Sequence, residues 1–222
     1  MLRLSRSICS LGICCLLLGA CADVPADGTE RYVVLPQDTL YSIAWRHDLD
    51  FRDLARWNNL GPDFRISVGQ VLLLRPGLKP KPTNPYPANP YPTSPPPRIT
   101  SSSLPWVWPT DRIGAPRPAS GGGIILSGRL GQDVRSASAG RVVYTGSGLR
   151  GYGNLIIIKH ADSLLSAYGH NREILVHEGQ DVALGQVIAH MGQDAHQAAI
   201  LYFEIRQNGR PVDPLAYLSK VK

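Results

Sequence analysis

Beyond residue 21 the sequence contains no cysteine, so no disulfide framework stabilises the bulk of the chain. The four cysteines of the 222-residue chain are Cys9, Cys14, Cys15 and Cys21. Runs of Lys or Arg are also absent, although the formal net charge is +6. Scattered positive charge of this size favours an ordinary envelope-compatible surface over a nucleic-acid-binding one. We therefore expect no nucleic-acid partner.

The apolar run near the N-terminus is too short to cross a membrane, because a helical span needs about 20 apolar residues. It covers roughly residues 8–18, follows Arg3 and Arg6, and ends in Gly19 and Ala20. A basic start, a short apolar stretch and a small-residue end are typical of a secretory signal peptide. We predict that residues 1–20 are a signal peptide that is removed.

The end of this segment, Leu18-Gly19-Ala20-Cys21, resembles the bacterial lipobox. The resemblance implies that Cys21 is lipidated, becomes the new N-terminus and attaches the chain to a membrane. Stable attachment needs more than one acyl chain. Ala22 follows the cysteine, which implies the periplasmic face of the outer membrane; Asp23 leaves the inner membrane as the alternative. A plain secretory signal with Cys21 as a free thiol is the other interpretation. Residues 21–30 then form a lipidated tether.

Residues 31–76 have the pattern of a small α+β unit with a minimal core. We expect a strand at 32–35, two helices that begin near 40 and 51, and a return strand at 71–74. Between the first strand and the first helix, Asp38 or Thr39 can cap the helix by accepting hydrogen bonds from its free amides.

Three segments of this unit resemble a LysM module: Gln37-Asp-Thr-Leu-Tyr-Ser-Ile-Ala44, Leu54-Ala-Arg-Trp-Asn-Asn-Leu60 and Ile66-Ser-Val-Gly-Gln-Val-Leu-Leu-Leu74. Gln37 stands where the family usually has Gly. The resemblance implies binding of an N-acetylglucosamine-containing glycan, here peptidoglycan. It maps the glycan site onto Asp38, Thr39, Leu40, Pro62, Asp63, Phe64 and Ile66. Leu40 and Ile66 can equally be core residues, and Asp38 and Thr39 can be caps only.

Residues 77–104 are a proline-rich linker that holds two Asn-Pro-Tyr-Pro repeats, at 84–87 and 89–92. Proline fixes φ and removes an amide donor, which excludes a helix or sheet interior. An extended, semi-rigid spacer of roughly 3 Å per residue is the favoured use. Recognition of the repeats by a partner is the alternative.

Residues 105–222 consist of short runs rich in Val, Ile and Tyr that glycines interrupt, which predicts a compact, mostly antiparallel β-domain. The glycine-rich segment 146–153 is expected to be a hairpin tip. The expected strands are 124–126, 134–137, 140–145, 154–160, 164–168, 187–191 and 201–206.

This region resembles the LytM, or lysostaphin-type, zinc endopeptidase domain. The motifs that carry the resemblance are Ala139-Gly-Arg-Val-Val-Tyr144, Gly151-Tyr-Gly-Asn154, Tyr168-Gly-His170 and Leu201-Tyr-Phe-Glu-Ile205. Combined with the lipobox and the LysM module, the architecture resembles the NlpD type of envelope lipoprotein. The expected fold class is therefore two domains: a small βααβ LysM module, a proline-rich linker and a mostly antiparallel β LytM-like domain.

The zinc site that the resemblance implies is degenerate. A working member carries His-x-x-x-Asp on an early strand and His-x-His on a late one, because zinc needs about three N or O ligands and an open position for water. Alignment on the family motifs places Gly121, Ile125 and Tyr202 at the three ligand positions. Ile200 takes the place of the assisting histidine, and His170 stands at its expected position. We therefore predict no metal, no cofactor and no peptidase activity.

The other histidines of this domain form no tight metal-binding pair on a predicted strand; they are His160, His177, His190 and His196. Asp194 lies close to His196, but in an expected loop. A rebuilt metal site is therefore the weaker interpretation. For His170, a hydrogen-bonded groove residue is favoured over a catalytic one. No Ser/His/Asp set stands in a recognisable local context, and the glycines at 121–123 lack the Lys-Ser or Lys-Thr of a phosphate loop.

A peptidase groove without ligands still suits partner binding, and the apolar residues Ile125, Ile200 and Tyr202 are expected to make it dry. The resemblance implies the partner. It is a periplasmic N-acetylmuramoyl-L-alanine amidase, activated during septal peptidoglycan splitting and daughter-cell separation. Two alternatives remain from other classes: a peptidoglycan endopeptidase with a non-standard metal site, and a plain wall-anchoring protein.

Overall fold

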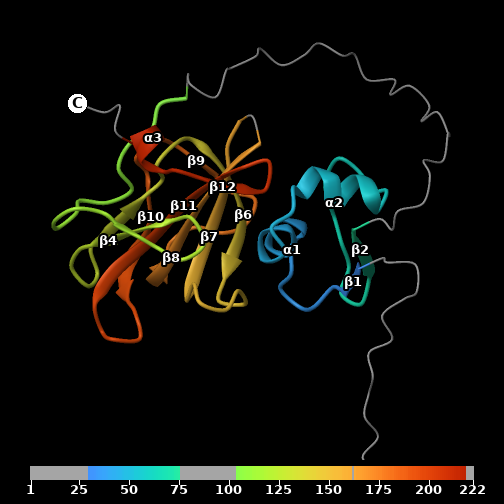
Figure 1. Cartoon of the computed structure of the whole chain (residues 1–222), viewed down its shortest axis with the longest axis horizontal. Coiled ribbons are helices and arrows are strands. Elements are labelled where there is room, and N and C mark those ends of the chain that lie inside the picture. Colours follow the sequence, from blue (N-terminus) through green and yellow to red (C-terminus); the bar gives the residue numbers. More distant parts are fainter. Residues whose placement is uncertain (1–29, 76–103, 162, 219–222) are drawn as a thin grey trace, which may run out of the picture.

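The computed structural model describes residues 30–75, 104–161 and 163–218, which form a small N-terminal module and a larger sheet domain (Figure 1). The expected signal peptide, the expected lipidation site Cys21 with residues 22–29 of its tether, and residues 77–103 of the expected linker lie outside the described residues. Within the described part of the chain, no helix is long and apolar enough to cross a membrane.

The N-terminal module has the expected order of strand, helix, helix and strand. Its elements are β1 (Glu30–Val33), α1 (Leu40–Arg46), α2 (Phe51–Trp57) and β2 (Val71–Arg75). The two strands pair antiparallel, and both helices pack against them through buried apolar side chains. This arrangement confirms the predicted βααβ unit.

Helix α1 begins at a capping box rather than at an aspartate cap. The Thr39 hydroxyl accepts a hydrogen bond from the Ser42 amide at 3.1 Å, and the Ser42 hydroxyl accepts one from the Thr39 amide at 3.0 Å. The carboxylate of Asp38 instead accepts from the Tyr32 hydroxyl and pairs with Arg46. Of the two residues proposed as caps, Thr39 therefore caps α1, and Asp38 fixes the loop that precedes it.

The sheet domain is built on one ten-stranded sheet in which all pairings are antiparallel, as predicted. The strand order is β3-β4-β11-β10-β8-β7-β6-β9, with β5 paired to β10 and β12 paired to β11. The strands are β3 (Arg117–Pro118), β4 (Ile124–Ser127), β5 (Asp133–Arg135), β6 (Gly140–Gly146), β7 (Asn154–Lys159), β8 (Leu164–Ile174), β9 (Asp181–Val182), β10 (Val187–Gln193), β11 (Ala199–Gln207) and β12 (Arg210–Val212). A short helix, α3 (Leu215–Leu218), follows.

The two faces of the sheet serve different purposes, because side chains alternate between faces along each strand. On β11, Leu201 and Phe203 point into the core of the sheet domain. The alternate residues of β11 lie on the opposite face, which we call the groove face; they are Ile200, Tyr202, Glu204 and Arg206. The groove face also carries Ile125 and Tyr202, two of the residues expected at the metal-ligand positions.

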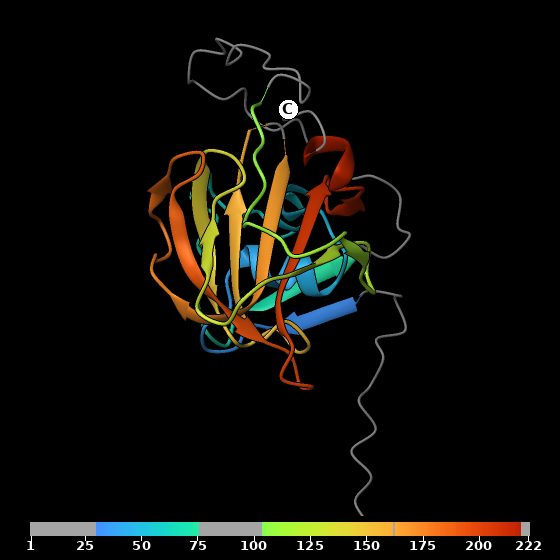
Figure 2. The ribbon, with the colours of Figure 1, turned by 90° about the vertical axis from the view of Figure 1, so that its left-hand side faces the viewer.

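The N-terminal module packs directly on the groove face, which the sequence did not predict. One hydrophobic core joins Leu40, Ile43 and Phe51 of the module to Leu155 and Ile157 of β7. Helix α1 lies beside β6 and β7 in Figure 1, and Figure 2 shows the module behind the sheet when the view is turned by 90°. The two domains, which the sequence separates by a proline-rich linker, thus share a core.

On the other side of the sheet, a buried histidine is part of a hydrogen-bonded chain. His160 is 4% exposed, and its Nδ1 lies 2.7 Å from the Ala139 carbonyl oxygen. A carbonyl only accepts, so Nδ1 carries the proton. The Nε2 atom lies 2.7 Å from the Ser166 hydroxyl, which lies 2.9 Å from the Tyr168 hydroxyl. Burial lowers the pKa of His160 to about 4, so the ring is neutral in the folded protein.

This histidine predicts acid destabilisation. Between pH 6.5 and about pH 4, the unfolded chain binds a proton at His160 that the folded chain does not, so stability falls as the pH falls. We expect His160 to contribute about 2–3 kcal/mol to the loss of unfolding free energy between pH 7 and pH 4.5. Urea denaturation at the two pH values measures it. His160→Gln should show a correspondingly smaller loss than wild type, whereas substitution of the exposed His177 should not. Equal pH dependence in wild type and His160→Gln would contradict the assignment.

Candidate functional site

The three residues that the sequence analysis assigned to the metal-ligand positions lie together on the groove face. Tyr202 of β11 is paired with Ile125 of β4 on one side and with Gly169 of β8 on the other. A methyl group built on Gly121 would lie 3.7 Å from the Tyr202 hydroxyl. Gly121, Ile125 and Tyr202 therefore surround one point on the sheet, although they come from different parts of the chain.

The chemistry of these three residues does not fit a zinc ion. Gly121 has no side chain, and Ile125 has no donor atom. The Tyr202 hydroxyl donates a hydrogen bond to the Glu204 carboxylate, and burial together with that carboxylate raises the pKa of Tyr202. The phenol therefore stays protonated and is not an anionic ligand. In the described part of the chain, no group of three His, Cys, Asp or Glu side chains is placed to hold a metal ion.

The two residues that the sequence analysis assigned to the positions of the catalytic histidines, His170 and Ile200, lie beside these three residues on β8 and β11. His170 follows Gly169 on β8 with a φ of 61° and is half-buried. Burial lowers the pKa of His170, and Asp194 partly offsets this. Its ring makes no hydrogen bond within residues 30–75, 104–161 and 163–218, which differs from the hydrogen-bonded histidine expected from the sequence. Ile200 is buried on β11, two residues before Tyr202.

The groove face is less apolar than predicted, because it contains a buried ion pair. Glu204 is fully buried, and Arg206 is 3% exposed. The Arg206 Nε donates to one oxygen of the Glu204 carboxylate at 2.7 Å, and the Tyr202 hydroxyl donates to the other. Both carboxylate oxygens therefore have a donor. The sequence did not indicate this polar network beside the expected apolar residues Ile125, Ile200 and Tyr202.

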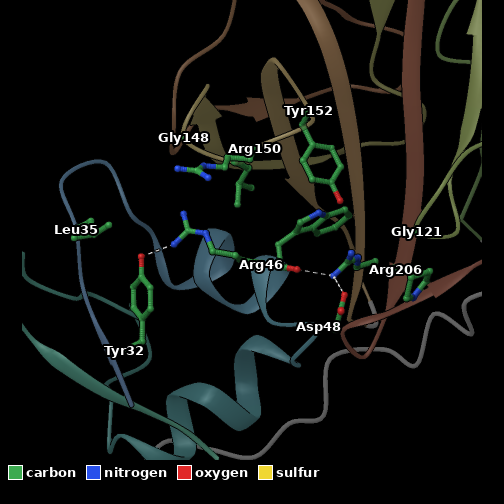
Figure 3. Close-up of a pocket in the computed structure, with 12 residues that line it drawn as sticks. Tyr32, Leu35, Arg46, Asp48, Gly121, Gly148, Arg150, Tyr152 and Arg206 are labelled. Carbon is green, nitrogen blue, oxygen red and sulfur yellow. Dashed lines mark hydrogen bonds and ion pairs between the residues drawn. The ribbon is translucent and has the colours of Figure 1, made fainter. Parts of the chain in front are cut away.

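Arg206 also connects the sheet domain to the N-terminal module. Its Nη1 donates to the Trp45 carbonyl at 2.8 Å and lies 3.0 Å from a carboxylate oxygen of Asp48 (Figure 3). The guanidinium carbon lies 3.8 Å from the centroid of the Trp45 ring. These contacts hold the C-terminal end of α1 on the groove face. The alternation of side chains along β11 is enough to place Arg206 on the same face as Tyr202. Nothing in the sequence, however, indicated that Trp45 is the partner of Arg206.

A pocket of about 820 Å³ lies between the two domains, beside the point where Gly121, Ile125 and Tyr202 meet; we call this point the vacated centre, after its expected loss of ligands, and the pocket the groove pocket. Gly121, Tyr152 and Arg206 line it from the sheet domain, and Arg46 and Asp48 line it from the module (Figure 3). The rings of Tyr152 and Tyr202 meet edge to face, with centroids 5.1 Å apart. A molecule that reached the vacated centre through this pocket would therefore contact the module as well.

The residues expected to bind glycan line a second cleft, of about 560 Å³, which we call the loop cleft. Six of the seven expected residues line it: Asp38, Thr39, Leu40, Asp63, Phe64 and Ile66. Pro62 is exposed and does not line the cleft. Leu40 is 1% exposed, so its side chain is a core residue, in agreement with the alternative. The opposite wall comes from the sheet domain and includes Arg141 and Lys159, which the sequence did not indicate.

Two families match the chain in the two places where the sequence resembled them. Residues 32–75 match the LysM domain, and residues 120–214 match peptidase family M23. A putative peptidase M23 from Pseudomonas aeruginosa is similar in structure, with a TM-score of 0.48 and 22% identity over 52% of this chain and 50% of that chain.

Relatives match across most of the chain. The lipoprotein NlpD/LppB homolog of Pseudomonas aeruginosa is 38% identical and covers 94% of this chain and 90% of its own length. The uncharacterized lipoprotein YgeR of Escherichia coli is 36% identical over 91% of this chain and 88% of its own length. The murein hydrolase activator NlpD of Salmonella dublin is 36% identical over 86% of this chain and 68% of its own length. The chain, in which a LysM domain is joined to an M23 peptidase domain, therefore belongs to the NlpD/LppB family of envelope lipoproteins.

Proposed function

We propose that this chain is a non-catalytic, peptidoglycan-binding lipoprotein that activates a periplasmic N-acetylmuramoyl-L-alanine amidase during septal cell-wall splitting and daughter-cell separation. The observation that carries the proposal is the vacated metal centre, where Gly121, Ile125 and Tyr202 meet without a set of ligand atoms. Relatives named murein hydrolase activators support the same conclusion.

The chemistry of the centre supports a binding role in place of hydrolysis. An M23-type hydrolysis requires a metal ion that activates water, and the metal requires N or O ligands. The groove pocket beside the centre keeps a concave surface of about 820 Å³ that a protein loop or helix can enter. Activation then requires that the groove binds the active state of the amidase more tightly than its inactive state.

The N-terminal module and the lipid would hold the activator where its partner works. The loops of the loop cleft would bind N-acetylglucosamine-containing glycan, and acyl chains on Cys21 would anchor the chain to the periplasmic face of the outer membrane. Two attachments raise the local concentration of the groove near the amidase, which strengthens a weak contact without adding new ones.

The test is dye release from labelled peptidoglycan by the soluble chain that begins at Ala22. We expect no release by the chain alone, release well above that of the amidase alone when the two are mixed, and no zinc in the purified protein. Inductively coupled plasma mass spectrometry on the same sample measures the metal. Bound zinc together with release by the chain alone would instead establish a working peptidase. If the chain neither releases dye by itself nor increases release by the amidase, the wall-anchoring role is the remaining interpretation.

A further inference from the structure

The sheet domain contributes a cation to the loop cleft. Lys159 ends β7, where it is paired with Arg141 of β6, and its side chain reaches toward the module. Its ammonium nitrogen lies 5.4 Å from the ring centroid of Phe51, 5.6 Å from that of Phe64 and 6.0 Å from that of Tyr41. Three aromatic rings of one domain thus surround a cation of the other, in the wall of a cleft.

The carboxylates of the loop cleft are already engaged elsewhere. Asp38 accepts from the Tyr32 hydroxyl at 2.7 Å and pairs with Arg46. Asp63 pairs with the neighbouring Arg65, and Glu178 accepts from the Thr145 amide. Each of these carboxylates therefore already has a cation or a hydrogen-bond donor beside it, and none of them is paired with Lys159.

Lys159 has no counter-ion among the residues that the structure describes, since no carboxylate there lies within ion-pairing distance of its ammonium. The side chain is half-buried, and burial together with the positive charges of Arg52 and Arg141 lowers the pKa of Lys159. A partly desolvated cation without a counter-ion is costly, and the aromatic rings offset only part of that cost. An anion that entered the cleft would restore the missing interaction.

The ligand expected at the loops of the module is N-acetylglucosamine, which is neutral and gains nothing from a cation. Peptidoglycan differs from a neutral N-acetylglucosamine polymer because its alternate sugars carry peptides with free carboxylates. We propose that Lys159 makes the sheet domain the second wall of the glycan site and selects glycan that bears carboxylates over neutral glycan. The inference rests on the proposed peptidoglycan binding and adds a specificity to it.

A purely structural role for Lys159 makes a different prediction. If the ammonium served only to join the domains through its three aromatic contacts, its loss would loosen the cleft and lower the affinity for every ligand to the same degree. If Lys159 is selective, its loss lowers only the affinity for the acidic ligand, because the neutral ligand makes no ion pair. The ratio of the two affinities therefore separates the roles, whereas either affinity alone does not.

The experiment is isothermal titration of the soluble chain with two defined ligands: a chito-oligosaccharide, and a peptidoglycan fragment with the same number of sugars and with its stem peptides. We expect wild type to prefer the peptide-bearing fragment. Lys159→Met should lower the affinity for the peptide-bearing fragment about tenfold and change the affinity for the chito-oligosaccharide less than twofold. Lys159→Arg should keep the preference. Arg129→Met, which removes an exposed cation in a loop of the sheet domain, is the matched control and should bind as wild type does.

Each outcome addresses one proposal. A wild-type chain that binds both ligands equally, or a Lys159→Met chain that loses both equally or neither, would overturn the selective role of Lys159 and leave glycan binding intact. A wild-type chain that binds neither ligand would overturn the proposed glycan binding itself. Thermal unfolding of each variant shows whether it is folded under the conditions of the titration.

Discussion

Replacement of Arg206 by Met is expected to lower the free energy of unfolding by about 3–5 kcal/mol. The reason is that Glu204 would remain buried without a counter-ion. Glu204 is fully buried, and Arg206 supplies the only cation that contacts its carboxylate within the described residues. Without it, a buried charge would keep only the Tyr202 hydroxyl as a donor. The same substitution removes the hydrogen bond to the Trp45 carbonyl and the contact with the Trp45 ring, so the module loses its polar attachment to the groove face.

A double-mutant cycle in urea measures this effect and separates it from general loss of packing. In a Glu204→Gln background, Arg206→Met leaves no buried carboxylate without a counter-ion. The substitution should therefore lower the free energy of unfolding much less there than in wild type. Arg135→Met is the control, because it breaks an Arg–Asp pair whose side chains are 45% and 43% exposed. That pair should contribute less than about 1 kcal/mol. Equal losses from Arg206→Met in both backgrounds would show that the buried pair is not the cause.

The contact between the domains marks the limit of what the sequence could predict. The βααβ module follows from local signals, such as the capping box at Thr39 and the apolar spacing along α1, which act over a few residues. The main strands of the sheet follow from apolar runs between glycines. By contrast, Arg206 and Trp45 lie 161 positions apart, and a proline-rich segment separates their domains. No periodicity or composition reports a contact of this kind.

The edges of the sheet were missed for a different reason. Strands β3 and β9 have two residues each, and β12 has three, which is too short for an alternating pattern to appear. Their positions depend on the strands beside them rather than on their own residues. The role of Lys159 could not be predicted either, because its neighbours in the sequence indicate only the end of a strand. Its importance depends on the aromatic rings of another domain.

The candidate centre was more accessible to sequence reasoning, because it depends on motifs at fixed positions of strands. The motifs identified Gly121, Ile125 and Tyr202, and the strand register brings them together. What the residues could not show is how Tyr202 is used. Its hydroxyl belongs to the network of Glu204 and Arg206, so it is bound to the polar core of the groove face instead of forming part of an apolar lining.

That difference decides which residue tests the proposed partner surface. A charged residue at position 202 would break the contact with Glu204 and disturb the fold, so a loss of activation would have two explanations. Ile125 lies beside Tyr202 on β4, is only half-buried, and makes no polar contact with its side chain. A glutamate there places a carboxylate on the groove face beside Tyr202 while the strand keeps its backbone pairing.

Ile125→Glu is therefore expected to raise about 30-fold the concentration of activator that half-maximal activation of the amidase requires. The reason is that a charge at the centre of a docking surface costs about 2 kcal/mol or more of binding free energy. Titration of the variant into a fixed amount of amidase, with dye release as the readout, measures it. Leu184→Glu is the matched control: Leu184 is 37% exposed in the turn after β9, at the opposite end of the strand order from β4, and its substitution should leave activation unchanged. Thermal unfolding checks that both variants are folded. Wild-type activation by a folded Ile125→Glu protein would place the amidase contact elsewhere, and the vacated centre would then be a remnant of the M23 fold without a role in the partner surface.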